Sequence, residues 1–382
     1  DGDFVRFRYG LPEKIGGWAQ LTAAEKTLPG AGRAAHAFSS LAGERYVAIG
    51  TSQGLFLYYG EDFYDISPLD TAITGCTFTT SAAAGTTVTI DKSSHGLEAG
   101  RYITLSSVSV TGDSTLTAGI LEKAYEVLTV PTVDKFTITA STAETGTGMT
   151  AAGSVVVNPY YIVGPTSQTV GYGWGTYLWG DSTWGTERTT SSVTLDPGTW
   201  SLDNYGQVLV ATISDGRTFT WNAGATNPRT IRASQSTTDF VTTSNPTVSF
   251  MTKVSDRDRH LFHLGTETTI GDASTQDKMF IRFSNQENLN EYTPTAINTA
   301  GTFRLDAGSE IRAAVAGKDY TLILTDTAAY VAQYVGPPYT FSIRQVGTNC
   351  GCMGMHAAVS ANGAVYWMGD AGGFYRYDGT VK

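Results

Sequence analysis

The clearest pattern of hydrophobic and polar positions lies near the C-terminal end, at residues 363–379. Two short apolar runs, 363–368 and 374–377, flank a glycine-rich corner. Glycines supply the positive φ that short hairpin loops need, so the pattern predicts an antiparallel hairpin. Alternation places Val365 and Tyr366 on opposite faces of this hairpin. Because both faces are largely apolar, we expect neighbouring elements to cover both.

Four similar hairpins precede this one, each with two runs of β-branched and aromatic residues joined by a turn or loop. They lie at 45–59, 207–221, 259–283 and 320–335. The second strands of the five hairpins begin near Leu55, Arg217, Met279, Ala329 and Phe374, so successive starts are 162, 62, 50 and 45 residues apart. The last three spacings are close to the roughly 40–50 residues of one four-stranded propeller blade.

The first spacing is too long for one blade, and two inserted segments account for the excess. Residues 76–155 contain five short strand-like runs, which predicts a small β-barrel or sandwich. Residues 171–185 form a loop rich in glycine and aromatic residues. We therefore predict an all-β protein, namely a β-propeller, incomplete in this segment, with an inserted small β domain. Several β-sandwich domains in a row are the alternative.

The predicted organisation has three parts. Residues 1–75 hold an N-terminal strand and the first blade, 76–155 the inserted domain, and 156–382 the further blades. The strand near Phe4–Tyr9 could complete a late blade. The chain begins at Asp1 without a methionine and stops directly after a hairpin. We therefore expect a longer polypeptide, with further blades or the closure of the ring outside this segment.

Composition and charge narrow the classes of function. The 382 residues include 43 glycines and 20 tyrosines, only 16% are charged, and the net charge is −10. An acidic chain without a visible basic cluster argues against a protein that grips duplex DNA. Like-charge repulsion would still let DNA pass close by without binding. No apolar stretch approaches the roughly 20 residues of a membrane helix, so we expect no membrane span.

Residue types that carry catalysis occur without a recognisable motif. Asp62, Asp65, Asp256 and Asp258 lie beside hairpins. A glycosidase could use two such carboxylates across a cleft, but solvated loop carboxylates are the simpler interpretation. The chain also lacks a phosphate-binding P-loop motif. We predict no enzymatic activity and no cofactor.

The histidines and cysteines do not form a metal motif either. His260 and His263 are three apart on a predicted strand, so they should point to opposite faces and cannot share a metal ion. Cys76, Cys350 and Cys352 are too few for a disulfide framework and lack the paired spacing of a zinc site. We interpret all three as small buried residues.

The most unusual segment is the loop at 171–185. Its aromatic side chains are the candidate interface residues Tyr172, Trp174, Tyr177, Trp179 and Trp184. Aromatic groups separated by glycines could form anchors at a protein interface or stack on sugar rings. The loop could equally fold onto its own blade as local core.

Three stretches carry a family resemblance: FVRFRYGLPEKIGGW at 4–18, FSIRQVGTNCG at 341–351, and YWMG with FYRYDG within 366–379. They resemble structural proteins of tailed bacteriophages, of the type assigned to the tail nozzle or to the hub at the lower end of the tail. The insert at 76–155 resembles small β modules common in phage virion proteins. No site residue can be carried over from this family, because short catalytic motifs do not define its functional surfaces.

The resemblance implies a virion component without catalysis, built from propeller-like β domains. Such a protein would assemble as a homo-oligomeric ring around the DNA channel of the tail. Its expected partners are other tail and adaptor proteins, tail fibres, and genomic DNA that passes through without specific binding. The alternative function is a glycan- or receptor-binding propeller that uses the loop at 171–185, and a propeller glycosidase ranks third.

Overall fold

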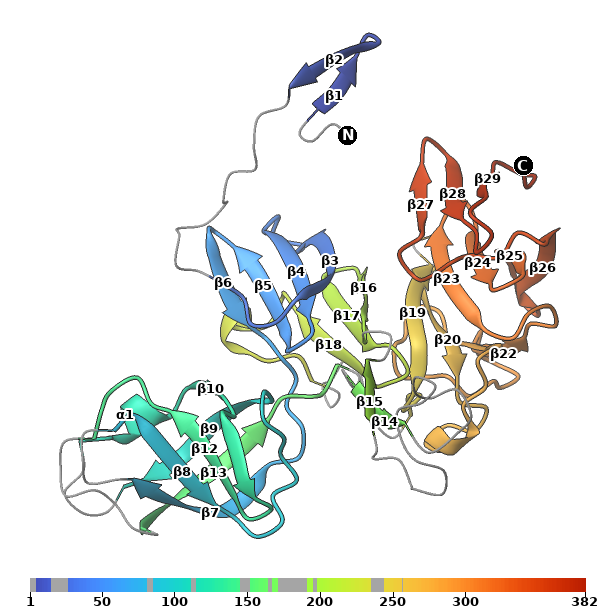
Figure 1. Cartoon of the computed structure of the whole chain (residues 1–382). Helices are drawn as coiled ribbons and strands as arrows, with labels where there is room; N and C mark the ends of the chain where they lie inside the picture. The colour runs from blue at the N-terminus through green and yellow to red at the C-terminus, as the bar shows by residue number, and fades with distance from the viewer. Residues whose placement is uncertain are drawn as a thin grey trace, which may run out of the picture.

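The structure is a computed structural model of the chain (Figure 1). It describes residues 5–14, 27–80, 85–110, 115–144, 152–163, 167–170, 191–194, 198–234, 244–255 and 257–382. Strands dominate these residues, and the helical turns among them are short: α1 (Ala118–Leu121), η1 (Pro228–Thr230) and η2 (Ala273–Thr275). The prediction of an all-β propeller with an inserted β unit is confirmed, because five small antiparallel sheets follow one another beside one larger curled sheet.

Each of the five small sheets is a blade whose strands pair antiparallel in chain order. Blade 1 consists of β3 (Gly32–Ser39), β4 (Arg45–Thr51), β5 (Leu55–Tyr59) and β6 (Asp62–Asp65). Blade 2 consists of β16 (Trp200–Tyr205), β17 (Val208–Ile213) and β18 (Thr218–Asn222). Blade 3 consists of β19 (Ser249–Ser255), β20 (His260–Thr266), β21 (Phe280–Phe283) and β22 (Gly301–Arg304). Blade 4 consists of β23 (Ile311–Ala316), β24 (Thr321–Thr325), β25 (Ala328–Gly336) and β26 (Thr340–Thr348). Blade 5 consists of β27 (Ala358–Ala361), β28 (Ala364–Met368) and β29 (Phe374–Tyr377).

Every hairpin predicted from the sequence supplies the second and third strands of one blade. In blades 2 and 5 an isolated β-bridge lies on the outer edge, where Ser234 pairs with Thr220 and Val381 pairs with Tyr377. The first strands of successive blades contact one another in the order β3, β16, β19, β23, β27. Among the described residues β27 and β3 make no comparable contact, so the blades form an open series (Figure 1).

Blades stack because their middle strands are apolar on both faces. On β24, Leu322 and Leu324 belong to the core shared with blade 5, while Ile323 between them belongs to the core shared with blade 3. All three side chains are fully buried. A strand that is covered on both faces reads as a continuous apolar run, which is the pattern found here.

Blade 5 departs from this pattern on its outer face. Val365 and Trp367 are buried against blade 4. On the other face, Val359 lies opposite Tyr366 in the register, and these side chains are 60% and 39% exposed. Phe374 on the neighbouring strand is 79% exposed. The expectation that both faces of the C-terminal hairpin are covered is therefore wrong for the described residues.

Blade 1 has a similar face at the other end of the series. Tyr46 and Ala48 on β4 are buried in the core shared with blade 2. The alternate residues Val47 and Ile49 point the other way and are only partly buried, and Ala35 beside Ile49 is exposed. Both terminal blades thus present an apolar face that an internal blade would cover.

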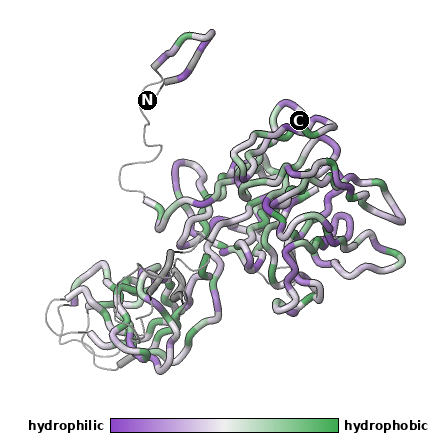
Figure 2. The backbone as a smooth tube through the Cα atoms, turned by 45° about the vertical axis from the view of Figure 1, so that its right-hand side comes forward, coloured by the Kyte–Doolittle hydropathy of each residue, from purple (hydrophilic) through white to green (hydrophobic). Residues whose placement is uncertain are grey.

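The inserted unit is one curled sheet of seven strands in the order β10, β9, β13, β7, β8, β12, β11. The strands are β7 (Ile73–Thr80), β8 (Thr87–Asp91), β9 (Tyr102–Ser109), β10 (Ala124–Glu126), β11 (Thr129–Thr132), β12 (Lys135–Thr139) and β13 (Ala152–Pro159). The sheet curls until β10 contacts β12, and it encloses an apolar core of its own. It forms a separate body beside the blades (Figures 1 and 2).

The N-terminal strand does not behave as predicted. β1 (Val5–Arg8) pairs with β2 (Leu11–Lys14) in a hairpin of its own, and among the described residues it pairs with no blade strand. The hairpin lies apart from the blades in Figure 1, and Tyr9 at its turn is 94% exposed. The prediction that residues 4–9 complete a late blade is therefore wrong. No helix among the described residues is long and apolar enough to cross a membrane.

Candidate functional site

The aromatic loop that the sequence singled out lies outside the described residues. Its interface candidates are Tyr172, Trp174, Tyr177, Trp179 and Trp184. The structure describes the backbone of the two strands that flank the loop, β14 (Ser167–Val170) and β15 (Ser191–Thr194), which pair antiparallel. The role of the loop in an interface stays a prediction.

The structure places the described acidic candidates on two different blades. Asp62 and Asp65 lie on β6 of blade 1, whereas Asp258 lies in the β19–β20 turn of blade 3. Asp256 is outside the described residues. The carboxylate of Asp65 accepts a hydrogen bond from the guanidinium of Arg232, so it already has a partner within the protein. In the same described part of the chain, no group of three or more His, Cys, Asp or Glu residues could hold a metal ion.

His260 and His263 point to opposite faces of β20, as the alternation predicted. His260 packs against the ring of Phe341 toward blade 4, with 5.0 Å between ring centroids. His263 lies on the other face, where Nδ1 is 2.8 Å from Ser249 Oγ and Nε2 is 3.2 Å from the Tyr292 hydroxyl. Burial lowers the pKa of His260 to about 4 and that of His263 to about 3, so both rings are neutral at pH 7. We interpret the Ser249–His263 pair as a closed core contact, because both residues are buried.

The three cysteines are free thiols and buried, in agreement with their interpretation as small core residues. Cys350 and Cys352 pack between blades 4 and 5, and Cys76 packs in the core of the inserted sheet. Burial raises the pKa of each thiol. A thiol with a raised pKa is a poor nucleophile at neutral pH.

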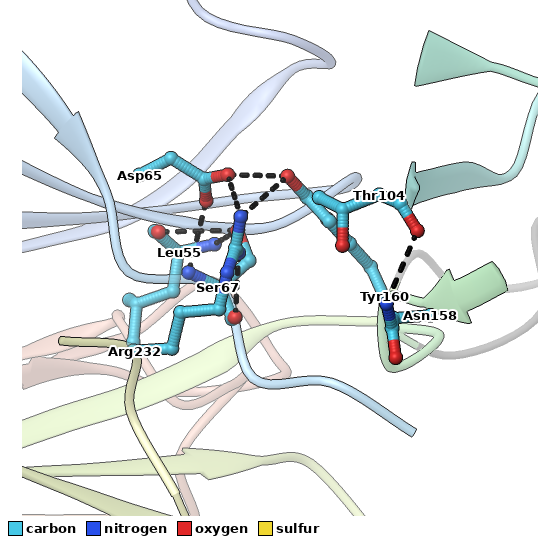
Figure 3. Close-up of polar contacts among 7 residues, drawn as sticks. All are labelled: Leu55, Asp65, Ser67, Thr104, Asn158, Tyr160 and Arg232. Carbon is cyan, nitrogen blue, oxygen red and sulfur yellow. Dashed lines mark hydrogen bonds and ion pairs between the residues drawn. The ribbon is translucent and has the colours of Figure 1, made fainter. Parts of the chain in front are cut away.

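A polar cluster that the sequence did not reveal joins the inserted sheet to the blades (Figure 3). Tyr160, directly after β13, donates its hydroxyl to Asp65 of blade 1. Arg232 of blade 2 donates to Asp65 Oδ2 at 2.8 Å and to Ser67 O at 3.0 Å. The guanidinium carbon of Arg232 also lies 5.0 Å from the centroid of the Tyr160 ring. Three segments that are far apart in the sequence therefore meet at one carboxylate.

We interpret this cluster as a structural attachment. Burial and the negative charge of Asp65 raise the pKa of the Tyr160 phenol, so its hydroxyl is protonated at pH 7 and donates to Asp65. On the side of the inserted sheet, Arg101 donates to the Tyr160 carbonyl at 3.0 Å and to Asp70 Oδ2 at 2.9 Å. Arg101 and Arg232 thus bind the segments that connect the inserted sheet to the blades.

The second feature absent from the sequence predictions is a groove of about 350 Å³ over blades 1, 2 and 3. It is formed by turns that lie at the same ends of their blades: the β3–β4 turn with Leu41, the β16–β17 turn, the β19–β20 turn and the β21–β22 loop. Its lining residues are Leu41, Tyr205, Gly206, Gln207, Val208, Asn222, Arg259, Glu287, Asn288, Leu289 and Asn290. The visible signal in the sequence is the amide-rich run Asn285–Asn290.

Comparisons with known proteins identify no family. No family model matches the chain, and no curated protein matches it. Among solved structures, the chain is similar to a protein titled "Phage phi92 endosialidase", with 15% sequence identity and a TM-score of 0.28. The alignment covers 94% of this chain and 55% of that protein, so this chain spans little more than half of its length. At this identity and TM-score the similarity carries no argument about function.

Proposed function

We propose that this chain is a structural component of a bacteriophage tail, part of a nozzle or hub ring through which DNA is ejected. The observation that carries the proposal is the pair of apolar sheet faces at the two ends of the blade series, which no described residue covers. On blade 5, Val359, Tyr366 and Phe374 are exposed on one face. Exposed apolar patches of this kind mark surfaces that bind other proteins.

The two end faces belong to different blades, so a contact between them would be head-to-tail. A head-to-tail contact between identical subunits generates a ring when the rotation closes. Blade 5 of one copy would then cover blade 1 of the next, and the contact would continue the stacking that β24 makes with both of its neighbours. The proposed assembly is therefore a homo-oligomer in the virion tail.

The charge and the inserted segments of the chain support our proposal for the remaining partners. A net charge of −10 suits a channel wall past which genomic DNA slides without binding. The inserted sheet and the loop at 171–185 would contact neighbouring tail proteins, adaptor proteins or fibres, because long insertions between core strands commonly carry function. Blades that are buried on both faces provide a rigid scaffold for such contacts.

Native mass spectrometry of the full-length protein and its Phe374→Glu variant tests the ring. We expect the wild type to form a closed oligomer and the variant to be monomeric, because a carboxylate buried in an apolar contact is costly. Phe303→Glu is the matched control, since Phe303 is 39% exposed on β22 of blade 3, away from the end faces. Antibody labelling of purified virions by electron microscopy then tests the location. A wild type that stays monomeric and is absent from virions would end the proposal.

A further inference from the structure

The groove over blades 1, 2 and 3 contains an arginine, Arg259, whose charge no carboxylate of the described residues neutralises. Among the described residues Arg259 forms no ion pair, whereas Arg257 on the same turn pairs with Asp319 at 3.1 Å. Arg259 is exposed, and its side chain lines the groove. A cation that is placed in a groove without a partner is available to a ligand anion.

Arg259 is held in place by contacts that leave its charge free. The guanidinium carbon lies 4.8 Å from the centroid of the Tyr205 ring, a stacking arrangement that fixes the planar group. The backbone of Arg259 has a φ of +49°, and its carbonyl accepts hydrogen bonds from the Tyr205 hydroxyl and the Glu287 N–H, both at 2.9 Å. The turn and the side chain are therefore pre-organised before any ligand arrives.

The opposite wall of the groove is the β21–β22 loop, which is also internally fixed. The half-buried carboxylate of Glu291 accepts hydrogen bonds from Asn285 Nδ2 at 2.7 Å and from Asn298 Nδ2 at 2.7 Å. This holds the segment that presents Glu287 and Asn288 to the groove. On the blade 1 side, the Leu41 N–H donates to Gln207 Oε1 at 3.4 Å, which links the first two turns.

We propose that this groove binds an acidic oligosaccharide, with the ligand carboxylate on Arg259. Sugar hydroxyls both donate and accept hydrogen bonds, as do the side-chain amides of Gln207 and Asn288, and Glu287 accepts from hydroxyls. Leu41 and Val208 supply apolar contact for the C–H faces of a sugar ring. The volume of about 350 Å³ is in the range of small-ligand pockets. A nucleic acid fits less well, because Glu287 and the net charge of −10 repel a phosphate backbone.

This inference goes beyond the proposed structural role and concerns turn residues of blades 1, 2 and 3. Its test is binding of the full-length protein to hexuronate-containing oligosaccharides and to their carboxyl-reduced neutral counterparts, which keep the same linkages. We expect the acidic forms to bind and the reduced forms to bind about tenfold more weakly, because a charge-assisted bidentate contact is lost. Binding of the acidic forms should weaken as salt is raised.

Variants at the same turn make the assignment specific. Arg259→Gln should weaken binding of the acidic oligosaccharides about tenfold and remove their advantage over the reduced forms. Arg257→Gln is the matched control, because this arginine lies on the same turn, is already paired with Asp319 and lines a different cavity. Glu287→Gln should strengthen binding, since it removes a like charge but keeps a polar group.

Two results would overturn the inference. The first is no binding of any acidic oligosaccharide to the wild type. The second is binding that Arg259→Gln leaves unchanged, which would place the saccharide elsewhere. Neither result bears on ring formation, which Phe374→Glu tests at a separate surface.

Discussion

Val365 and Tyr366 are consecutive residues on β28, yet Val365 is fully buried against blade 4 and Tyr366 is 39% exposed on the outer face of blade 5. Alternation along a strand sends neighbouring side chains to opposite faces of the sheet. The contrast therefore marks the boundary between a face that another blade covers and one that no described residue covers. The same boundary occurs on β4 of blade 1.

Substitutions at these two positions should have unequal effects on stability. Val365→Ala should lower the free energy of unfolding by about 2 kcal/mol, because it removes buried methyl groups and leaves a cavity. Tyr366→Thr should change it by only about 0.5 kcal/mol in the isolated chain, since the site is partly exposed and threonine suits a strand. Urea denaturation followed by tryptophan fluorescence measures both. Equal losses would mean that the outer face is covered in solution.

Gly50 on β4 is predicted to be intolerant of any side chain. A Cβ at this position would lie 2.4 Å from Cδ1 of Trp200, which is fully buried and donates its indole N–H to the Thr51 carbonyl at 2.9 Å. Gly50→Ala should therefore destabilise the protein by about 1–3 kcal/mol through overpacking at the contact of blades 1 and 2. Differential scanning calorimetry gives the shift in Tm.

Gly32→Ala is the control for this effect. Gly32 lies opposite Thr51 on the neighbouring strand β3, and a Cβ there would meet nothing within 4 Å. Because alanine also restricts the unfolded chain, this variant should be neutral or slightly more stable. A loss at Gly32 as large as the loss at Gly50 would contradict the packing explanation.

The hairpins could be predicted from the sequence because their information is local. A turn residue and two flanking runs, as at 363–377, are enough to specify two paired strands. The contact of Gly50 with Trp200 could not be predicted in this way, since it joins positions that are far apart in the chain. On β24 the pattern shows that both faces are buried, but it does not say that Leu322 faces blade 5 and Ile323 faces blade 3.

The candidate site was less predictable than the fold. Arg257 and Arg259 look alike in the sequence, and the structure places both on one turn as exposed residues. Only the structure shows that Arg257 pairs with Asp319 and that Arg259 stacks on Tyr205 beside the groove. Pairing of this kind depends on which turns meet, and that depends on the stacking of whole blades.

The polar cluster of Asp65, Tyr160 and Arg232 should contribute to stability, because it attaches the inserted sheet to the blades. Arg232→Met should lower the free energy of unfolding by about 1–3 kcal/mol, because Asp65 and the Tyr160 hydroxyl lose the donor that both contact. Because the side chains of Arg232 and Asp65 are partly exposed, the loss of stability should be smaller than for a fully buried ion pair. Limited proteolysis should also show faster cleavage between the two units, since the segments around Tyr160 would open more often.

Tyr160→Phe provides the comparison for this prediction. It removes only the hydroxyl, and the ion pair between Arg232 and Asp65 at 2.8 Å can persist. The expected loss is about 1 kcal/mol, the value of one hydrogen bond. If Tyr160→Phe were as damaging as Arg232→Met, the ring packing of the tyrosine and not the carboxylate would be the main attachment.

The buried histidines predict a loss of stability in mild acid. His260 and His263 have pKa values of about 4 and about 3 in the folded state, below the ordinary 6.5. Above pH 6.5 both histidines are neutral in the folded and unfolded states. As the pH falls below 6.5 the unfolded chain takes up protons first, so stability falls until the folded-state pKa values are reached. Between pH 6.5 and 5 we expect a loss of about 1.5 kcal/mol per histidine.

The variant His260→Phe with His263→Gln separates this effect from other titrations. Phenylalanine suits the aromatic surroundings of His260, which include Phe283 and Phe341, and glutamine can still bond to Ser249. Urea midpoints measured at pH 6.5 and pH 5 should show a clearly smaller acid loss in the double variant than in the wild type. Asp277 and Asp326 have pKa values below the ordinary 3.8, so their effect on stability falls below the range from pH 6.5 to pH 5. They therefore do not mask the effect of the histidines. If both proteins lost the same amount of stability between pH 6.5 and pH 5, the two histidines would not be its cause. They would then take up protons equally well in the folded and unfolded states.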